Sequence, residues 1–252
     1  MLSSGISVLI ELFLFFGLLS MAYVIEVMVS VTRIVGLRQY DLGAAITLQS
    51  ALALISRLVV FVYMPLAGFI VDFNSQILNI NTLIIPFSII PVLVVLIAIN
   101  ASYTTKIIGT LIQRVQVTGS YFSSCPEEKE AVRVDINIFQ DYSAVAEIHR
   151  LGEFKAFSLF VSYVLYYSAW PAIFFAIYLQ PEYRTTIFAS AALFTGLNTL
   201  CSALITDPVT LKLSGQNSTA CEQYLKFLVR IRVYSALIAF ILTALVSFLL
   251  YV

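Results

Sequence analysis

Residues 6–30 read ISVLIELFLFFGLLSMAYVIEVMVS and carry only two charged side chains, Glu11 and Glu26. A helix needs about 20 apolar residues to cross a hydrocarbon core of about 30 Å, so this run is long enough to span a membrane. It is longer than the apolar core of a signal peptide and has no basic segment before it. We therefore expect a retained membrane-spanning helix.

The rest of the chain has the same character. Of its 252 residues, 60% are hydrophobic and 11% are charged, and the mean hydropathy is +0.96. Soluble domains carry about 25% charged residues, so this chain has too little polar surface to cover a water-soluble globule. The sequence predicts an all-α membrane protein, a single polytopic domain over residues 1–252. Six transmembrane helices are expected near residues 6–30, 43–65, 83–101, 157–180, 186–206 and 233–251.

Basic residues are distributed unevenly between the loops. Twelve of the 14 Lys and Arg residues fall in the loops after the first, third and fifth predicted spans. Loops rich in Lys and Arg remain in the cytoplasm, so both termini are expected outside. Three spans followed by three spans would give the two halves opposite orientations, as in transporters built from inverted repeats.

The third loop, residues 102–156, is long enough to hold structure of its own. The stretch from Pro126 to Glu130 resembles the first turn of a helix, where proline and carboxylates are favoured. Apolar residues then recur at steps of three and four. We expect one or two cytoplasmic amphipathic helices lying on the bundle or on the bilayer surface.

Several charged residues lie where a membrane would make them unfavourable. Arg57 is in the middle of the second predicted span, and Glu26 and Arg33 are seven residues apart on one face of the first, with Ser30 between them. A charge at mid-bilayer costs about 2.5–3.5 kcal/mol on insertion scales. We therefore expect Glu26 to lie near Arg57. Such a pair either holds two helices together or belongs to a polar substrate cavity.

Two arginines near the end of the first span suit a phosphate ligand. Arg33 and Arg38 are placed at the depth of lipid headgroups, and a guanidinium offers a planar fork of donors to phosphate oxygens. The alternative is that both only anchor the helix at the membrane surface.

Prolines and aspartates mark the expected ends of two other spans. Pro65 should kink or end the second span, Gly68 would allow close backbone approach, and Asp72 follows on the outer side. The fifth span is expected to end at Asp207–Pro208 on the cytoplasmic side.

Familiar catalytic and metal-binding motifs are absent from the sequence. There is no P-loop, HExxH or GxSxG motif, and the single histidine and three cysteines do not form a ligand set. We therefore expect no cofactor and no metal. The formal net charge is zero, which gives no indication of a nucleic-acid partner.

Several of these residues fall together in the pattern of one family. The segment from Glu26 to Arg38 resembles the Glu-x3-Ser-x2-Arg-x2-Gly-x-Arg segment that closes the first helix of Amj-type lipid II flippases. Ser56–Arg57 is similar to that family's Ser-Arg pair, and Pro65, Gly68 and Asp72 follow at its spacing. The segment 181–186, which contains Arg184, and the pair Asp207–Pro208 also resemble the family.

The resemblance departs from the family in the fifth span. The family has Asn-Gly-x-Ala-Thr twelve residues before the aspartate, whereas this chain reads Thr195-Gly-Leu-Asn198-Thr. The amide is displaced by three residues, nearly one helical turn, and can serve the same face. The family's Gly-Thr in the last helix is also absent, which makes this chain a divergent member.

The resemblance implies a function, a location and a substrate. It implies a flippase of the bacterial cytoplasmic (inner) membrane that moves undecaprenyl-pyrophosphate-linked peptidoglycan precursor, lipid II, to the outer leaflet for cell wall synthesis. Its implied partners are this lipid and the surrounding membrane lipids. The implied substrate-binding residues are Glu26, Ser30, Arg33, Arg38, Arg57, Asp72, Arg184, Thr195, Asn198 and Asp207.

Other readings of the sequence remain open. The substrate could be another polyprenyl-linked oligosaccharide. An enzyme acting on an isoprenoid phosphate would need a carboxylate set facing one leaflet, whereas the acidic residues here are scattered. A non-transporting scaffold would use the charge pairs only structurally. Six helices make a small transporter, which also leaves a homodimer open.

Overall fold

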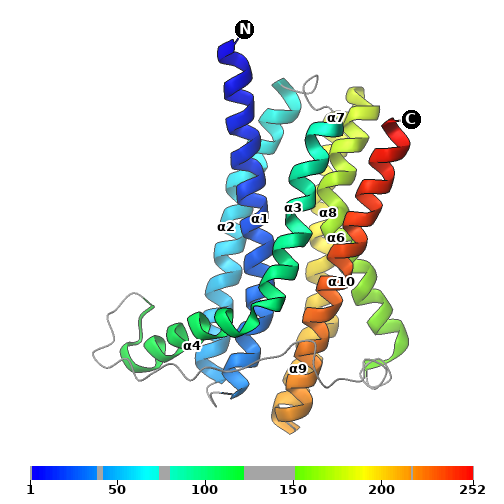
Figure 1. The fold of residues 1–252 in the computed structure, drawn as a ribbon. Helices are drawn as coiled ribbons and strands as arrows, with labels where there is room; N and C mark the ends of the chain where they lie inside the picture. Colours follow the sequence, from blue (N-terminus) through cyan, green and yellow to red (C-terminus); the bar gives the residue numbers. More distant parts are fainter. Residues whose placement is uncertain (1, 39–41, 74–79, 122–150, 217, 252) are drawn as a thin grey trace.

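The computed structural model describes residues 2–38, 42–73, 80–121, 151–216 and 218–251 of the chain. These residues are almost entirely helical, and they contain no strand. Long helices run side by side along one bundle (Figure 1): α1 (Leu2–Arg38), α2 (Leu42–Phe73), α3 (Ile80–Ile99), α6 (Glu153–Leu179) and α10 (Ser218–Tyr251). A further row consists of η1 (Pro181–Tyr183), α7 (Arg184–Ala189), α8 (Ala191–Cys201), η2 (Ser202–Thr206) and α9 (Asp207–Gln216).

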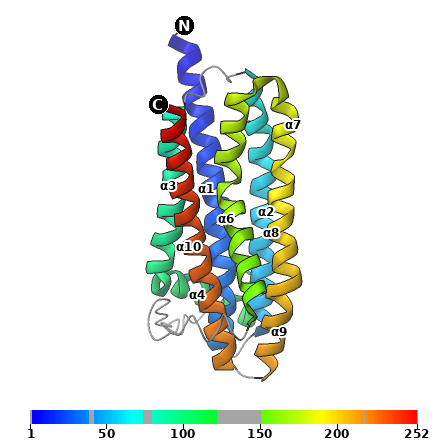
Figure 2. The same ribbon diagram turned by 90° about the vertical axis from the view of Figure 1, so that its right-hand side faces the viewer.

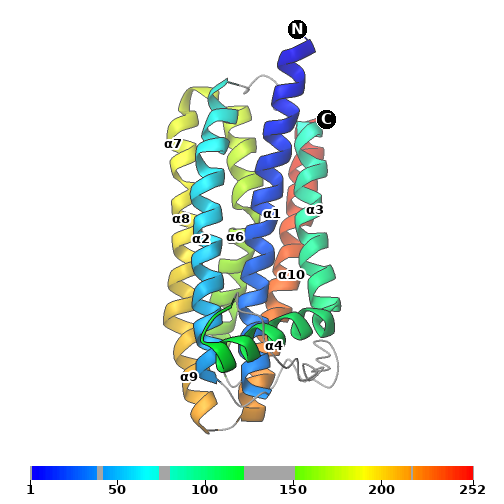
Figure 3. The ribbon, with the colours of Figure 1, turned by 90° about the vertical axis from the view of Figure 1, so that its left-hand side faces the viewer.

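The two ends of the bundle differ. The start of α1 and the end of α10 lie at one end, which we call the terminus end (Figure 1). The helices α9 and α4 (Ala101–Thr118) lie at the other, which we call the α4 end. Figure 3 shows α4 crossing the bundle there instead of running along it.

Within the residues that the structure describes, five helical segments are long and apolar enough to cross a membrane. They are Ile10–Arg38, Gly43–Asp72, Glu153–Leu179, Pro181–Gly215 and Thr219–Leu249. A sixth is obtained if Ile89–Ile99 and Tyr103–Thr118, bent by 71° relative to each other, form one broken span. The all-α membrane class is confirmed. The number of six spans, their 3+3 inverted arrangement and the orientation of the termini stay predictions.

Two predicted helix ends are wrong. The helix α2 continues through Pro65 to Phe73, so the span does not end at this proline, and the alternative of a kink there stays a prediction. Pro65 is exposed, and proline is tolerated in membrane helices where its freed carbonyl finds another partner. The fifth span does not end at Asp207–Pro208. It passes through the π-helical segment η2 into α9, whose first turn holds both residues.

The last helix begins earlier than predicted. It starts at Ser218, whereas the expected span covers residues 233–251. Lys226, Arg230 and Arg232, which were assigned to a cytoplasmic loop, therefore lie within α10. Arg232 is only 7% exposed, so a residue taken for a loop charge belongs to the interior of the bundle.

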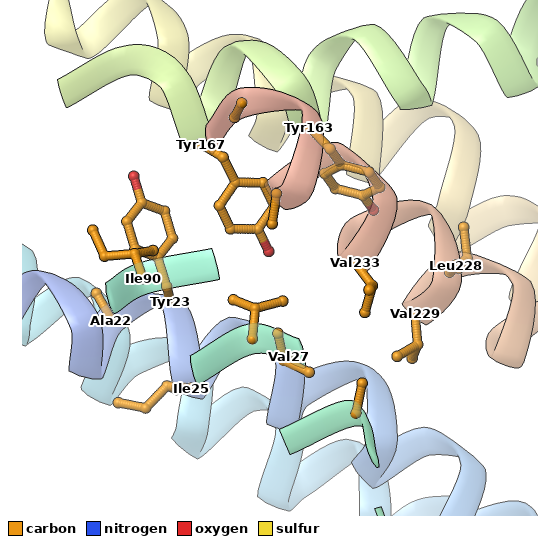
Figure 4. Close-up of a cluster of buried hydrophobic side chains, with 14 of the residues drawn as sticks. Ala22, Tyr23, Ile25, Val27, Ile90, Tyr163, Tyr167, Leu228, Val229 and Val233 are labelled. Carbon is orange, nitrogen blue, oxygen red and sulfur yellow. The ribbon is translucent and has the colours of Figure 1, made fainter. Parts of the chain in front are cut away.

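The helix α1 lies at the centre of the packing. Its side chains Phe15, Leu19 and Val27 are almost completely buried. Figure 4 shows Tyr23 and Val27 of α1 facing the region where α6 and α10 meet. In contrast, large apolar side chains such as Phe13, 80% exposed, and Phe61, 78% exposed, lie on the outside. Exposed apolar surface of this extent is unusual for a soluble monomer and fits contact with lipid.

The predicted loop 102–156 is described only in part. Its first segment is α4, which packs against α1 and α2. Ile108 and Ile112 of α4 are fully buried, whereas Lys106 is exposed, so this helix has one apolar and one polar face. The helix predicted to begin at Pro126 lies outside the described residues.

Candidate functional site

A cavity of about 450 Å³ lies inside the bundle, from its middle toward the α4 end. We call it the polar cavity. Its walls come from α1, α2, α6, α8, η2 and α10 and from the first residue of α9. Five charged side chains line it: Glu26, Arg33, Arg57, Asp207 and Arg232.

The polar cavity opens sideways between two rows of helix. On α2, the lining residues Arg57 and Phe61 are exposed, and on α8 the lining residues Thr195 and Thr199 are exposed. Figures 2 and 3 draw α2 and α8 next to one another, whereas Figure 1 shows them apart, so the two helices flank the cavity without packing closely against each other. We call the facing sides of α2 and of α8, η2 and α9 the α2/α8 seam. Since these helices are membrane-spanning candidates, the seam leads toward lipid.

The deepest charge pair joins Glu26 of α1 to Arg232 of α10. The Arg232 Nη1 atom lies 3.3 Å from the Glu26 carboxylate and donates to the Glu26 carbonyl oxygen at 3.0 Å. The Arg232 guanidinium also lies 4.7 Å from the centre of the Tyr163 ring, in cation–π geometry. Glu26 and Arg57 line the same cavity, but the ion-pair partner of Glu26 is Arg232 of α10 and not Arg57.

A second charge network crosses the seam at the side of the polar cavity that faces the α4 end. Arg33 donates to Asp207 at 2.7 Å, to Gln49 at 2.6 Å and to Thr210 at 3.4 Å. The network therefore joins the end of α1 and the start of α2 to the start of α9. Gln49 and Thr210 carry no charge, and nothing in the sequence patterns singled them out.

Arg57 differs from the other two cavity arginines. Both cavity carboxylates are already paired, Glu26 with Arg232 and Asp207 with Arg33. Arg57 has no ion pair or hydrogen bond within the described part of the chain, and it is exposed at the mouth of the cavity. Three arginines against two carboxylates leave one positive charge, and Arg57 carries it. A cationic cavity wall at the middle of a spanning helix is suited to an anion.

Hydroxyl and amide groups complete the lining. Ser30 and Ser56 are buried beside the arginines. The Asn198 Oδ1 atom is buried with no hydrogen-bond partner among the described residues. Buried polar groups nearly always have a partner, so this atom favours a cavity that holds water or a polar ligand.

Seven of the ten predicted site residues line this one cavity. They are Glu26, Ser30, Arg33, Arg57, Thr195, Asn198 and Asp207. The structure does not bring the other three there. Arg38 binds Glu222 through two hydrogen bonds of 3.0 and 2.6 Å. Arg184 pairs with Asp72 at 3.3 Å, where α7 begins and α2 ends.

The most important residue that the sequence reasoning missed is Arg232. It was counted among loop charges because Lys226, Arg230 and Arg232 fall close together. Apolar residues continue between these charges, from Leu225 to Val233, in the same pattern as in the rest of α10. That continuity is the signal that would have placed Arg232 in a membrane helix.

The described residues contain no group of three or more His, Cys, Asp or Glu side chains that could hold a metal ion. Comparisons with protein-family models, curated proteins and solved structures give no match to this chain.

Proposed function

We propose that this protein moves the anionic headgroup of a polyprenyl-pyrophosphate-linked saccharide across the membrane. The resemblance to Amj-type flippases makes lipid II the expected substrate. The observation that carries the proposal is Arg57, an arginine without a described partner at the open mouth of a polar cavity inside a membrane bundle.

The chemistry of the cavity matches the need of such a headgroup. A pyrophosphate cannot cross hydrocarbon bare, because its charges would lose their hydration. Arg57 supplies a permanent positive charge and a fork of donors, and Thr195, Thr199 and Ser202 supply hydroxyl groups on the opposite wall. These groups replace water around the anion while it is inside the bundle.

The shape of the cavity suits a lipid rather than a water-soluble anion. Its mouth lies in the α2/α8 seam, beside Phe61, whose side chain is 78% exposed on the outside of α2. A headgroup can enter through the seam while its hydrocarbon chain stays in the bilayer. The volume of about 450 Å³ is within the range of about 300–1,000 Å³ typical of ligand sites. It accommodates a pyrophosphate and the first sugar, and a longer saccharide requires the seam to widen.

The proposed direction follows from the distribution of basic residues. Arg38, Lys212 and Lys226 belong to the α4 end of the bundle, so the positive-inside rule places this end in the cytoplasm. We propose a bacterial cytoplasmic membrane, with the headgroup entering from the α4 end and leaving at the terminus end. The membrane potential then favours export of an anion by about 2.3 kcal/mol per charge per 100 mV.

The test is a leaflet-specific assay of labelled lipid II in proteoliposomes. Arg57→Ala is expected to slow translocation about 10–100-fold, since a hydrogen bond to a charged group contributes about 1.5–3 kcal/mol. Arg57→Lys keeps the charge but loses the fork, and should retain part of the rate. Arg38→Ala removes the same charge outside the cavity and serves as the matched control.

Three outcomes would reject the proposal. One is translocation by Arg57→Ala at the wild-type rate with equal protein in the membrane. Another is a covalent change in lipid II on incubation with the protein, which would indicate an enzyme of isoprenoid phosphates. The third is a protein that neither moves nor alters the lipid, which would support a scaffold.

A further inference from the structure

A second cavity, of about 420 Å³, adjoins the polar cavity on the side of the α4 end. We call it the apolar cavity. Most of its walls are hydrocarbon side chains from the end of α1, the start of α2, α9 and α10, including Leu37, Ile46, Pro208, Leu211 and Leu225. Its character therefore differs sharply from that of the polar cavity beside it.

The two cavities share one wall. Arg33, Gln49, Ala203, Asp207 and Leu225 line both of them. The wall includes the hydrogen bonds of Arg33 to Gln49 and to Asp207, so Arg33 stands where the polar lining changes to the apolar lining. In a lipid, the phosphate stands at the same kind of boundary, between a polar headgroup and a hydrocarbon chain.

The apolar cavity also opens into the α2/α8 seam. Ile46 of α2 is 48% exposed and Leu211 of α9 is 73% exposed, and both line the cavity. Both lie within membrane-spanning candidates, Gly43–Asp72 and Pro181–Gly215. The mouths of the two cavities therefore follow one another along the same seam, within segments that face lipid.

We propose that the apolar cavity binds the first part of the hydrocarbon chain of the same lipid whose headgroup occupies the polar cavity. This inference rests on the proposed function. The phosphate lies at the shared wall, between Arg33 and Arg57, and the chain leaves it through the seam beside Ile46 and Leu211. The two cavities together form one amphiphile site, and the chain determines which lipids bind there.

The test fills the apolar cavity from two different helices. Ile46→Trp and Leu211→Trp place a larger side chain at its mouth. Ile55→Trp, on the same helix as Ile46 and 46% exposed, and Leu193→Trp, 74% exposed on α8, are matched controls that line neither cavity. Binding is measured with purified protein for two pyrophosphate-linked saccharides that carry the same sugar, one with a full-length polyprenyl chain and one with a ten-carbon chain.

Wild-type protein is expected to bind the long-chain lipid at least tenfold more tightly than the short-chain lipid. Ile46→Trp and Leu211→Trp should abolish this preference by weakening long-chain binding, with short-chain binding within about twofold of wild type. Both control variants should keep the preference. As an independent measurement, a photoreactive group in the first isoprene units should label the start of α2 and α9 instead of α3.

Three results would overturn the inference. Unchanged long-chain binding in both cavity variants shows that the chain lies elsewhere. Equal weakening of both lipids shows that the cavity supports only the headgroup site. Loss of a co-purified phospholipid from these variants, with long-chain binding intact, assigns the cavity to ordinary membrane lipid. If wild-type protein binds neither saccharide lipid, the proposed function itself fails, which is distinct from all three.

Discussion

The α2/α8 seam is bridged by charge pairs at both ends, and the two bridges differ in strength. At the α4 end, the side chains of Arg33 and Asp207 are 14% and 53% exposed and lie 2.7 Å apart, and Arg33 also donates to Gln49 and Thr210. At the terminus end, Arg184 and Asp72 are 43% and 56% exposed and lie 3.3 Å apart. We call these the α4-end bridge and the terminus-end bridge.

The difference in strength between the two bridges indicates at which end of the bundle the seam opens more easily. An exposed pair contributes about 0–1 kcal/mol because water screens it. A part-buried arginine with three partners holds its helices more firmly, since losing one partner leaves buried polar groups unsatisfied. The described form is therefore closed more firmly at the α4 end. Under the proposed orientation, a headgroup arriving from the cytoplasm must compete with Asp207 for Arg33.

The largest expected difference comes from removing the arginine of each bridge. Arg33→Ala is expected to lower the free energy of unfolding by about 2 kcal/mol, because Gln49 and Asp207 lose a charged donor. It should also weaken binding of a pyrophosphate-linked saccharide about 10–100-fold. Arg184→Ala should lower stability by less than about 0.5 kcal/mol and leave binding within twofold.

Denaturation of purified protein and equilibrium binding of the labelled lipid measure both effects. Equal losses from the two substitutions would show that the bridges are equivalent, and would remove the argument that the α4 end is the firmer one.

The next prediction concerns Asp207 and Asp72, the carboxylates of the two bridges. Removing the charge of Asp207 should strengthen binding but lower stability. Asp207→Asn removes the competitor of the lipid phosphate for Arg33, so anion binding should become about three- to tenfold tighter while stability falls by about 1 kcal/mol. Asp72→Asn, at the terminus-end bridge, should change neither quantity measurably. Titration with the labelled lipid is the measurement. Weaker binding by Asp207→Asn would show that Asp207 contacts the substrate or positions Arg33 for it.

The sequence indicated which residues line the polar cavity better than which of them form ion pairs with each other. Apolar length was sufficient to identify the spanning segments that carry Glu26, Arg57 and Asn198, and seven of the ten predicted residues meet in one cavity. Which side chain meets which depends on the rotation and vertical register of each helix. Those are set by packing of the whole bundle, for instance around Tyr163 and Arg232. For that reason Glu26 forms its ion pair with Arg232, although Arg57 lines the same cavity.

Helix ends were the other weakness. Charges close together in sequence were taken to mark a loop, yet Lys226 and Arg232 lie within α10 because apolar residues continue between them. Asp207–Pro208 was taken as a stop, although proline is also favoured in the first turn of a helix. The π-helical segment η2 before it left no signal in composition. The pair Asp207–Pro208 therefore indicates a change in helix geometry at this point. It does not indicate whether the chain leaves the membrane there.

A smaller effect is expected at Arg38, which lies at the same end of the bundle as Arg33 but outside the seam. Arg38 binds Glu222 at the same end of the bundle, but neither residue lines the polar cavity. Arg38→Ala is expected to lower the free energy of unfolding by about 1 kcal/mol, since Glu222 keeps Lys226 at 2.8 Å as a partner. Lipid binding should stay within twofold of wild type. A binding loss as large as that of Arg33→Ala would show that any positive charge at this end attracts the headgroup.

The smallest expected effect is that of Gly68→Ala, near the terminus-end bridge. A Cβ atom added there would lie 4.0 Å from the Cζ atom of Phe188 in α7, which is ordinary van der Waals contact. The structure thus contradicts the expectation that this glycine permits close backbone approach. Gly68→Ala should stabilise the helix by up to about 0.5–1 kcal/mol, because alanine loses less backbone entropy on folding, and translocation should be unchanged.

Gly68→Leu provides the contrast, because its longer side chain must displace the Phe188 ring, which also contacts Trp170. It is expected to destabilise by about 1–3 kcal/mol, as overpacking typically does. Thermal unfolding of the two variants beside wild type measures the difference. Destabilisation by Gly68→Ala of more than about 1 kcal/mol would mean that α2 and α7 pack tightly at the terminus end. The seam would then be closed as firmly there as at Arg33, and the difference between its two ends would disappear.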